Sequence, residues 1–173
     1  MQTHRLKFHP AFVPGGVTGL SVRWGRVAGD RMMLRYRLDG CGDVILPNQT
    51  ESGRADDLWR TTCFELFIAD AGGSYREFNF APSGQWAAYR FNGYRNGAGD
   101  YDPITLPEIT KDSGASVLTV TAFLSVEEFA TSSHVSLTAV IEEKRRRMSY
   151  WAHRHSGQLP DFHEPTCFAL PVP

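Results

Sequence analysis

The stretch from Leu58 to Phe91 constrains the fold more than any other part of the sequence. It contains three short apolar and aromatic runs, and these are separated by Gly72-Gly73 and by Pro82-Ser83-Gly84. Glycine, proline and serine favour tight turns, and short runs of this kind between such turns are typical of β-strands. The stretch therefore predicts a meander of three antiparallel strands.

The middle run of this meander alternates with a period of two. Its residues divide into a mainly aromatic set and a polar set, which are Arg76, Phe78 and Phe80 on one side and Tyr75, Glu77 and Asn79 on the other. Successive side chains of a strand point to opposite faces of the sheet, so the aromatic set is expected to be buried. The other set is then available for polar contacts.

Further short strands are expected along the rest of the chain. Apolar or alternating runs lie at residues 17–24, 32–38, 116–124, 134–142, 149–152 and 167–172. Ser125 and Glu128 have the spacing of a capping box, which predicts one short helical turn. Regular short strands without alternating helices predict one all-β domain over residues 1–173, an antiparallel β-sandwich of about nine to eleven strands.

Three polar segments are expected to be loops. Residues 39–57 and 92–112 are rich in glycine, asparagine, aspartate and proline, and long loops of this kind in a compact domain are usually functional or mobile. Residues 144–147 are four consecutive cations flanked by Glu142 and Glu143. The adjacent acids cancel part of this charge, so a solvated hairpin loop is favoured over a nucleic-acid site.

Composition excludes several classes of partner. The chain has 18 basic and 19 acidic residues, so it has no long-range field for nucleic acid or an anionic membrane. The N-terminus lacks the apolar region of a signal peptide, and no apolar run approaches the roughly 18 residues of a membrane span, which predicts a cytoplasmic protein. The cysteines at 41, 63 and 167 are odd in number and lack C-x-x-C spacing, which argues against disulfides and zinc. The oligomeric state stays open.

Two blocks of the sequence resemble a known family. The first contains Trp59, Cys63 to Phe67 and the pattern Tyr75-x-Glu77-Phe78-x-x-x-Pro82-x-Gly84, and the second runs from Tyr150-Trp151 to Phe168 through Pro160-Asp161-Phe162-His163-x-Pro165. Both are similar to motifs of the type 9 carbohydrate-binding modules and their DOMON-like relatives, in particular the bacterial stand-alone, intracellular branch. The resemblance implies an immunoglobulin-like or jelly-roll sandwich. It also implies that two tryptophans, Trp59 and Trp151, clamp a sugar.

Other residues are candidates for the same site. Glu65 lies inside an apolar strand, where an unpaired carboxylate is costly, so it needs either a partner or a cleft. Polar neighbours that could bind the edges of a ligand are Glu77, Asn79, Arg90 and His153. A structural ion pair is the alternative for the charged ones. Trp24 and Trp86 lie in alternating strands without a motif match, and we expect them in the core.

The sequence favours binding over catalysis. It has no nucleophile elbow, no glycosidase motif and no phosphate-binding glycine loop, so no catalytic residue is predicted. We therefore expect a non-catalytic module for a small carbohydrate or a related polar ligand, with no metal and no cofactor. Three alternatives stay open: a haem or redox module using Met148 or Met32/Met33 with a histidine, an enzyme whose two carboxylates are Glu65 and Glu77, and an interaction scaffold.

Overall fold

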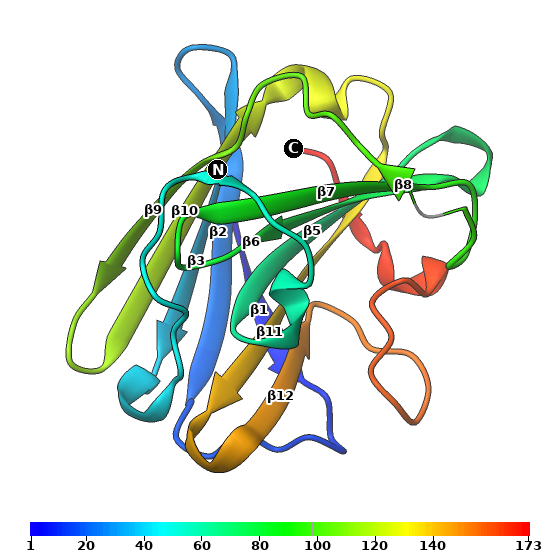
Figure 1. Ribbon diagram of the computed structural model, residues 1–173. Coiled ribbons are helices and arrows are strands. Elements are labelled where there is room, and N and C mark those ends of the chain that lie inside the picture. Colours follow the sequence, from blue (N-terminus) through cyan, green and yellow to red (C-terminus); the bar gives the residue numbers. More distant parts are fainter. Residues whose placement is uncertain (98) are drawn as a thin grey trace.

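The computed structural model describes residues 1–97 and 99–173 (Figure 1). In this part of the chain nearly all regular structure is β, which confirms the predicted fold class. The strands are β1 (Gln2–Phe8), β2 (Gly19–Val27), β3 (Arg31–Asp39), β4 (Gly53–Arg54), β5 (Cys63–Ala69), β6 (Tyr75–Phe80), β7 (Gln85–Phe91), β8 (Gly99–Asp100), β9 (Glu108–Ser113), β10 (Val117–Ser125), β11 (His134–Glu143), β12 (Arg147–Ala152) and β13 (Leu170–Pro171). Single 3-10 turns lie between them: η1 (Cys41–Asp43), η2 (Leu58–Arg60), η3 (Ala71–Gly73), η4 (Val126–Phe129), η5 (Lys144–Arg146) and η6 (Pro165–Cys167).

The strands form one curled sheet with two halves. Its order is β4-β7-β6-β5-β11-β12-β1-β2-β3-β10-β9, with β13 beside β11 and β8 beside β7. The described neighbours are antiparallel except for the short parallel pair β4 and β7. β1 joins the halves, because its residues 2–6 pair with β2 while its residues 7–8 pair with β12. Figure 1 shows the curled course of the sheet as a whole.

The main core lies between the two halves of the sheet. Tyr36 of β3 contacts Phe64 of β5 at 5.0 Å between ring centroids, and its hydroxyl donates to the carbonyl oxygen of Glu65 at 2.7 Å. Trp24 and Trp86 belong to this core, as predicted. Each large apolar side chain buried here contributes about 1.5–3 kcal/mol, so the facing halves stabilise each other.

The predicted meander is confirmed, but four strands were not expected: β1, β9 and the two-residue strands β4 and β8, which lie in segments predicted to be loops. β5, β6 and β7 pair in order, and residues 75–80 form β6. β1 escaped prediction because Leu6 is its one buried residue, so its sequence shows no apolar period. The prediction of a loop over residues 92–112 was wrong at its end, where β9 pairs with β10 as a polar edge strand. Ala98 of that predicted loop lies outside the described residues.

The predicted helical turn and the basic hairpin are both present. Ser125 caps η4 by accepting a hydrogen bond from the backbone N–H of Glu127 at 3.2 Å. Residues 144–147 are exposed in the connection from β11 to β12, as expected for a solvated hairpin.

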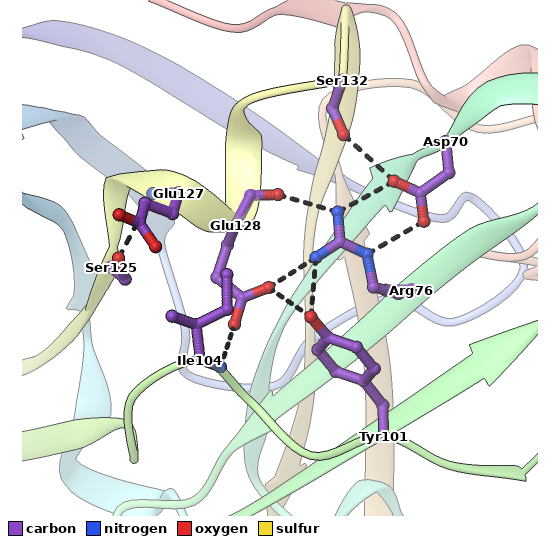
Figure 2. A network of polar contacts seen from close by, with 8 residues as sticks. All are labelled: Asp70, Arg76, Tyr101, Ile104, Ser125, Glu127, Glu128 and Ser132. Carbon is purple, nitrogen blue, oxygen red and sulfur yellow. Dashed lines mark hydrogen bonds and ion pairs between the residues drawn. The ribbon is translucent and has the colours of Figure 1, made fainter.

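Glu128 departs from the capping-box prediction because its side chain turns into the protein. Figure 2 shows it beside Arg76, which also binds Asp70 through two nitrogens at 2.9 and 2.8 Å. The Glu128 carboxylate accepts further hydrogen bonds from the Tyr101 hydroxyl at 2.8 Å and from the Ile104 N–H at 2.7 Å. This network ties β6, η4 and the segment around residue 101 together, and its cation is fully paired.

Candidate functional site

A pocket of about 540 Å³ opens on the outer face of β5, β6, β7, β11 and β12. Phe64, Leu66 and Phe78 point into the core, so the alternation of the strands places Glu65, Phe67 and Glu77 on the opposite face. Three segments outside the sheet add walls to this face. They contribute Trp59 from η2, Arg95 from the loop after β7, and Pro160, Phe162 and His163 from the C-terminal segment.

Aromatic rings form most of the pocket walls. They belong to Trp59, Phe67, Tyr89, Phe91, Tyr150 and Phe162. Trp59 differs from the rest because 46% of its surface is exposed. Its neighbour Leu58 is buried among Cys63, Ala81 and Ala87, which fixes η2 against the sheet. Burial of Leu58 therefore holds the turn in place, and the Trp59 indole stays half-exposed at the rim of the pocket.

Two carboxyl groups form the polar floor of the pocket. Glu65 lies opposite Asn79 of β6 and Thr138 of β11, and Glu77 lies opposite Phe67 and Tyr89. Glu65 and Glu77 are thus diagonal neighbours on adjacent strands, and such residues are typically about 7–8 Å apart. They are 2% and 6% exposed. Both acids therefore sit in a largely desolvated site.

The hydrogen-bond partners of these carboxyl groups are neutral. The Thr138 hydroxyl donates to Glu65 at 2.9 Å, and the Asn79 amide donates to Glu77 at 2.9 Å. Among the described residues, neither acid forms an ion pair with a lysine or an arginine. The nearest basic ring atom is Nε2 of His163, at 3.8 Å from the Glu77 carboxylate.

Burial changes the protonation of the floor. Burial, and then the charge of Glu77, raise the pKa of Glu65 to about 8. Burial raises the pKa of Glu77 to about 7, although the Asn79 hydrogen bond and Arg95 lower it. Burial and then Arg95 lower the pKa of His163 to about 4, so this imidazole is neutral at pH 7. The floor can therefore both donate and accept hydrogen bonds near neutral pH.

A second polar cluster fastens the C-terminal segment to the pocket. The Tyr75 hydroxyl and Nδ1 of His163 are hydrogen-bonded at 2.8 Å. Asp161 accepts from the Arg95 guanidinium at 2.9 Å and from the backbone N–H of His163 at 3.1 Å. The Tyr75–His163 and Arg95–Asp161 bonds join segments more than sixty residues apart in sequence. The charge of Arg95 is thereby committed to Asp161.

The structure brings together some of the residues predicted from sequence. Trp59, Glu65 and Glu77 line one pocket, and Asn79 is fully buried next to Glu77. Met148, one of the methionines named in the haem alternative, is half-buried beside the aromatic cluster of this face. In the described part of the chain, no group of three histidine, cysteine or acidic residues has the geometry of a metal site.

The other predicted residues lie elsewhere. Trp151 is 3% exposed in the main core, where its indole N–H donates to the Ser149 hydroxyl at 2.9 Å. The strand alternation gives the outer face to Tyr150 instead. Arg90 is exposed, with its guanidinium 5.1 Å from the centre of the Tyr101 ring. The His153 ring packs against His4 at 5.5 Å, outside this pocket.

Sequence reasoning missed several residues that line the pocket. Tyr89 and Tyr150 are on the outer face by strand alternation alone, so the period-two pattern could have indicated them. Phe162 and His163 belong to the second block that resembles the family, and Arg95 is a possible partner of the glutamates by its charge, but all three come from irregular segments whose place at the pocket no local period indicates. Separately, none of the helical turns in the described residues is long and apolar enough to span a membrane.

Comparison with known proteins identifies a relative in fold. No protein-family model and no curated protein sequence matches the chain. A solved structure of a putative carbohydrate-binding protein from Bacteroides uniformis is similar, with a TM-score of 0.65 and 13% sequence identity. The alignment covers 99% of this chain and 86% of that one. At this identity the likeness shows a shared fold, and it extends over nearly the whole chain.

Proposed function

We propose that this protein binds a small carbohydrate, without converting it, in the pocket lined by Trp59, Glu65 and Glu77. One observation carries the proposal: a half-exposed indole stands at the rim of an aromatic-lined pocket whose floor holds two hydrogen-bonding carboxyl groups. A sugar ring has apolar C–H faces and a belt of hydroxyl groups, which match these two surfaces. A volume of about 540 Å³ suits one or two sugar units.

The second aromatic wall in this proposal is not Trp151. Tyr89 and Tyr150 line the pocket and are half-buried, so each has an edge or face open to a ligand. The Tyr89 hydroxyl is held by Asp56 at 2.7 Å, which orients its ring. The fold shared with a protein described as carbohydrate-binding supports the same class of ligand.

Titration of intrinsic tryptophan fluorescence with mono- and disaccharides tests the proposal. We expect a saturable change with at least one sugar, and Trp59→Ala should weaken its binding by about tenfold or more because the stacking surface is lost. Phe8→Ala is the matched control, since it removes a partly exposed ring that packs on Trp151 outside the pocket. A folded Trp59→Ala variant that binds every sugar as the parent does would overturn the proposal.

A hydrolase is the second candidate, because two carboxyl groups with raised pKa values share one pocket. Glycosidases also act through two carboxyl groups in one site, of which the general acid has a raised pKa. Incubation with the sugars that bind, followed by chromatography of the products, separates the two candidates. Cleavage that is lost in both Glu65→Gln and Glu77→Gln would establish the enzyme, whereas binding without cleavage supports the module.

A further inference from the structure

The pocket floor contains two acids, and among the residues that the structure describes there is no cation free to neutralise them. Thr138 and Asn79, which bond to Glu65 and Glu77, are neutral donors. Arg95 lines the pocket, but its guanidinium binds Asp161. His163, the remaining basic group at the floor, lies 3.8 Å from Glu77 and is desolvated. The floor is therefore short of positive charge.

The network around Arg76 is a comparison within the same protein, because its acids have a structural role and are paired with a cation. There Asp70 and the fully buried Glu128 share one buried guanidinium (Figure 2). Burying a carboxyl group without such a partner is costly. Because Glu65 and Glu77 bear that cost side by side on the floor of an open pocket, their missing partner is expected to come from outside the chain.

The rings around the floor suit a cation as well as a sugar. Phe67, Tyr89, Phe91 and Tyr150 line the pocket around the two glutamates. The face of an aromatic ring attracts an ammonium group, and the effect increases when water is excluded. Aromatic rings combined with carboxylates are thus a chemistry that recognises amines.

We infer that the ligand is an amino sugar, whose ammonium group binds between Glu65 and Glu77 while its ring packs on Trp59. This inference rests on the proposed function and specifies its ligand class. An ammonium bound to a carboxylate makes a charge-assisted hydrogen bond of about 1.5–3 kcal/mol. That energy corresponds to a preference of about tenfold or more over the neutral parent sugar.

Binding of such a ligand is coupled to protons. An ammonium group favours the ionised carboxylates, so its binding expels protons from Glu65 and Glu77 and strengthens as pH rises from 5 to 7. The other titratable groups that face the floor are Cys63, Tyr75, Tyr89, Tyr150, His163 and Arg95. Burial raises the pKa of the Cys63 thiol and of the Tyr75 and Tyr89 phenols, which stay neutral, and His163 is uncharged above pH 5. Glu77 titrates at the upper end of this window, with a pKa of about 7, and Glu65 follows at about 8.

Isothermal titration calorimetry with paired sugars tests the inference. The pairs are glucosamine with glucose, galactosamine with galactose, and mannosamine with mannose, each at pH 5 and pH 7 in buffers of different ionisation enthalpy. We expect at least one amino sugar to bind about tenfold or more tightly than its parent at pH 7. The preference should shrink at pH 5, and about one proton should be released per ligand bound at pH 7.

Substitutions locate the effect at the floor. Glu65→Gln should lower the ratio of amino-sugar to parent-sugar affinity by about tenfold, because the amide keeps the shape and loses the charge. Glu77→Gln provides the same test if Glu65→Gln does not fold. Glu51→Gln, at an exposed carboxylate outside the pocket, is the matched control and should leave the ratio unchanged.

The outcomes separate this inference from the proposed function. Equal binding of an amino sugar and its parent, without proton release, would overturn the inference while leaving a carbohydrate-binding pocket. Binding of methylammonium with no binding of any sugar would retain a cation site and overturn the proposed function. An absence of binding by all six sugars and by methylammonium would overturn both.

Discussion

The two faces of β5, β6 and β11 are both buried, yet they differ in chemistry. The inner face carries Phe64, Leu66 and Phe78 and packs against the other half of the sheet. The outer face of the same strands carries Glu65, Glu77 and Thr138 and lies under a pocket. Burial by itself therefore does not separate core from candidate site. The distinguishing feature of the candidate site is that its carboxyl groups are buried without a charged partner in the part of the chain that the structure describes.

Charge alone is not the difference either. Arg76 lies on the inner side of β6, but Asp70 and Glu128 neutralise it. Within the described residues, the carboxyl groups of Glu65 and Glu77 on the outer face have neutral hydrogen-bond partners, Thr138 and Asn79. The comparison thus predicts that substitutions inside the core and its ion network reduce stability, whereas substitutions at the outer face change pH dependence and binding.

The largest effect on stability is expected at Trp151. Trp151→Ala removes a large ring from the main core, and such changes cost about 3–5 kcal/mol of unfolding free energy. Urea unfolding measures the loss. If the variant instead unfolded like the parent and lost sugar binding, Trp151 would belong to the site and the comparison would fail.

The ion network comes next. Arg76→Met leaves the buried carboxylate of Glu128 without its cation, which should cost about 3 kcal/mol in urea unfolding. Arg90→Met is the control, because Arg90 is exposed and its guanidinium lies over the face of Tyr101, and it should cost less than about 1 kcal/mol. Similar losses in both variants would contradict the assignment of Arg76 as the structural cation.

A smaller, pH-dependent effect is expected at Glu65. Its pKa is about 8 in the folded protein against an ordinary value of 4.5. The folded state binds this proton more tightly, so the stabilisation is complete below pH 4.5 and is lost as pH rises through about 8. Glu65→Gln has no such loss, and its stability relative to the parent should increase by about 1–3 kcal/mol between pH 4 and pH 9.

Thermal unfolding across this pH range measures the effect, and Glu51→Gln serves as the exposed control. If stability changed with pH in the same way in the parent and in Glu65→Gln, the Glu65 carboxyl would have an ordinary pKa. The two faces would then not differ in the protonation of their buried acids.

The smallest effect on stability is expected at Trp59. The half-exposed indole at the rim supports little of the fold, so Trp59→Ala should change the unfolding free energy by less than about 0.5 kcal/mol. Leu58→Ala should cost about 2 kcal/mol, because Leu58 anchors the same turn. Chemical denaturation compares them, and a larger loss for Trp59→Ala than for Leu58→Ala would assign Trp59 to the core.

Much of the fold could be predicted from local pattern. The period of two in residues 75–80 predicted β6 and placed Glu77 and Asn79 on the face opposite Phe78. β1 and β9 could not be predicted in this way, because both are largely exposed and have no apolar period. These strands form because they pair with β2, β12 and β10, and such pairing between distant segments leaves no pattern in the local sequence.

The sequence by itself determined the strands that have an apolar or alternating pattern and the two faces of each one, because backbone geometry makes side chains alternate whatever lies around them. It singled out Trp59, Glu65 and Glu77, but it did not show which other residues line the pocket with them. Tyr150 and Trp151 are adjacent aromatic residues, and only the packing of β12 against the other half of the sheet decides that Trp151 is in the core. Arg95 and His163 reach the pocket from distant irregular segments through contacts that form only when the chain folds. Such long-range packing has no signature in local periodicity, so tertiary structure alone decided which residues enclose the site.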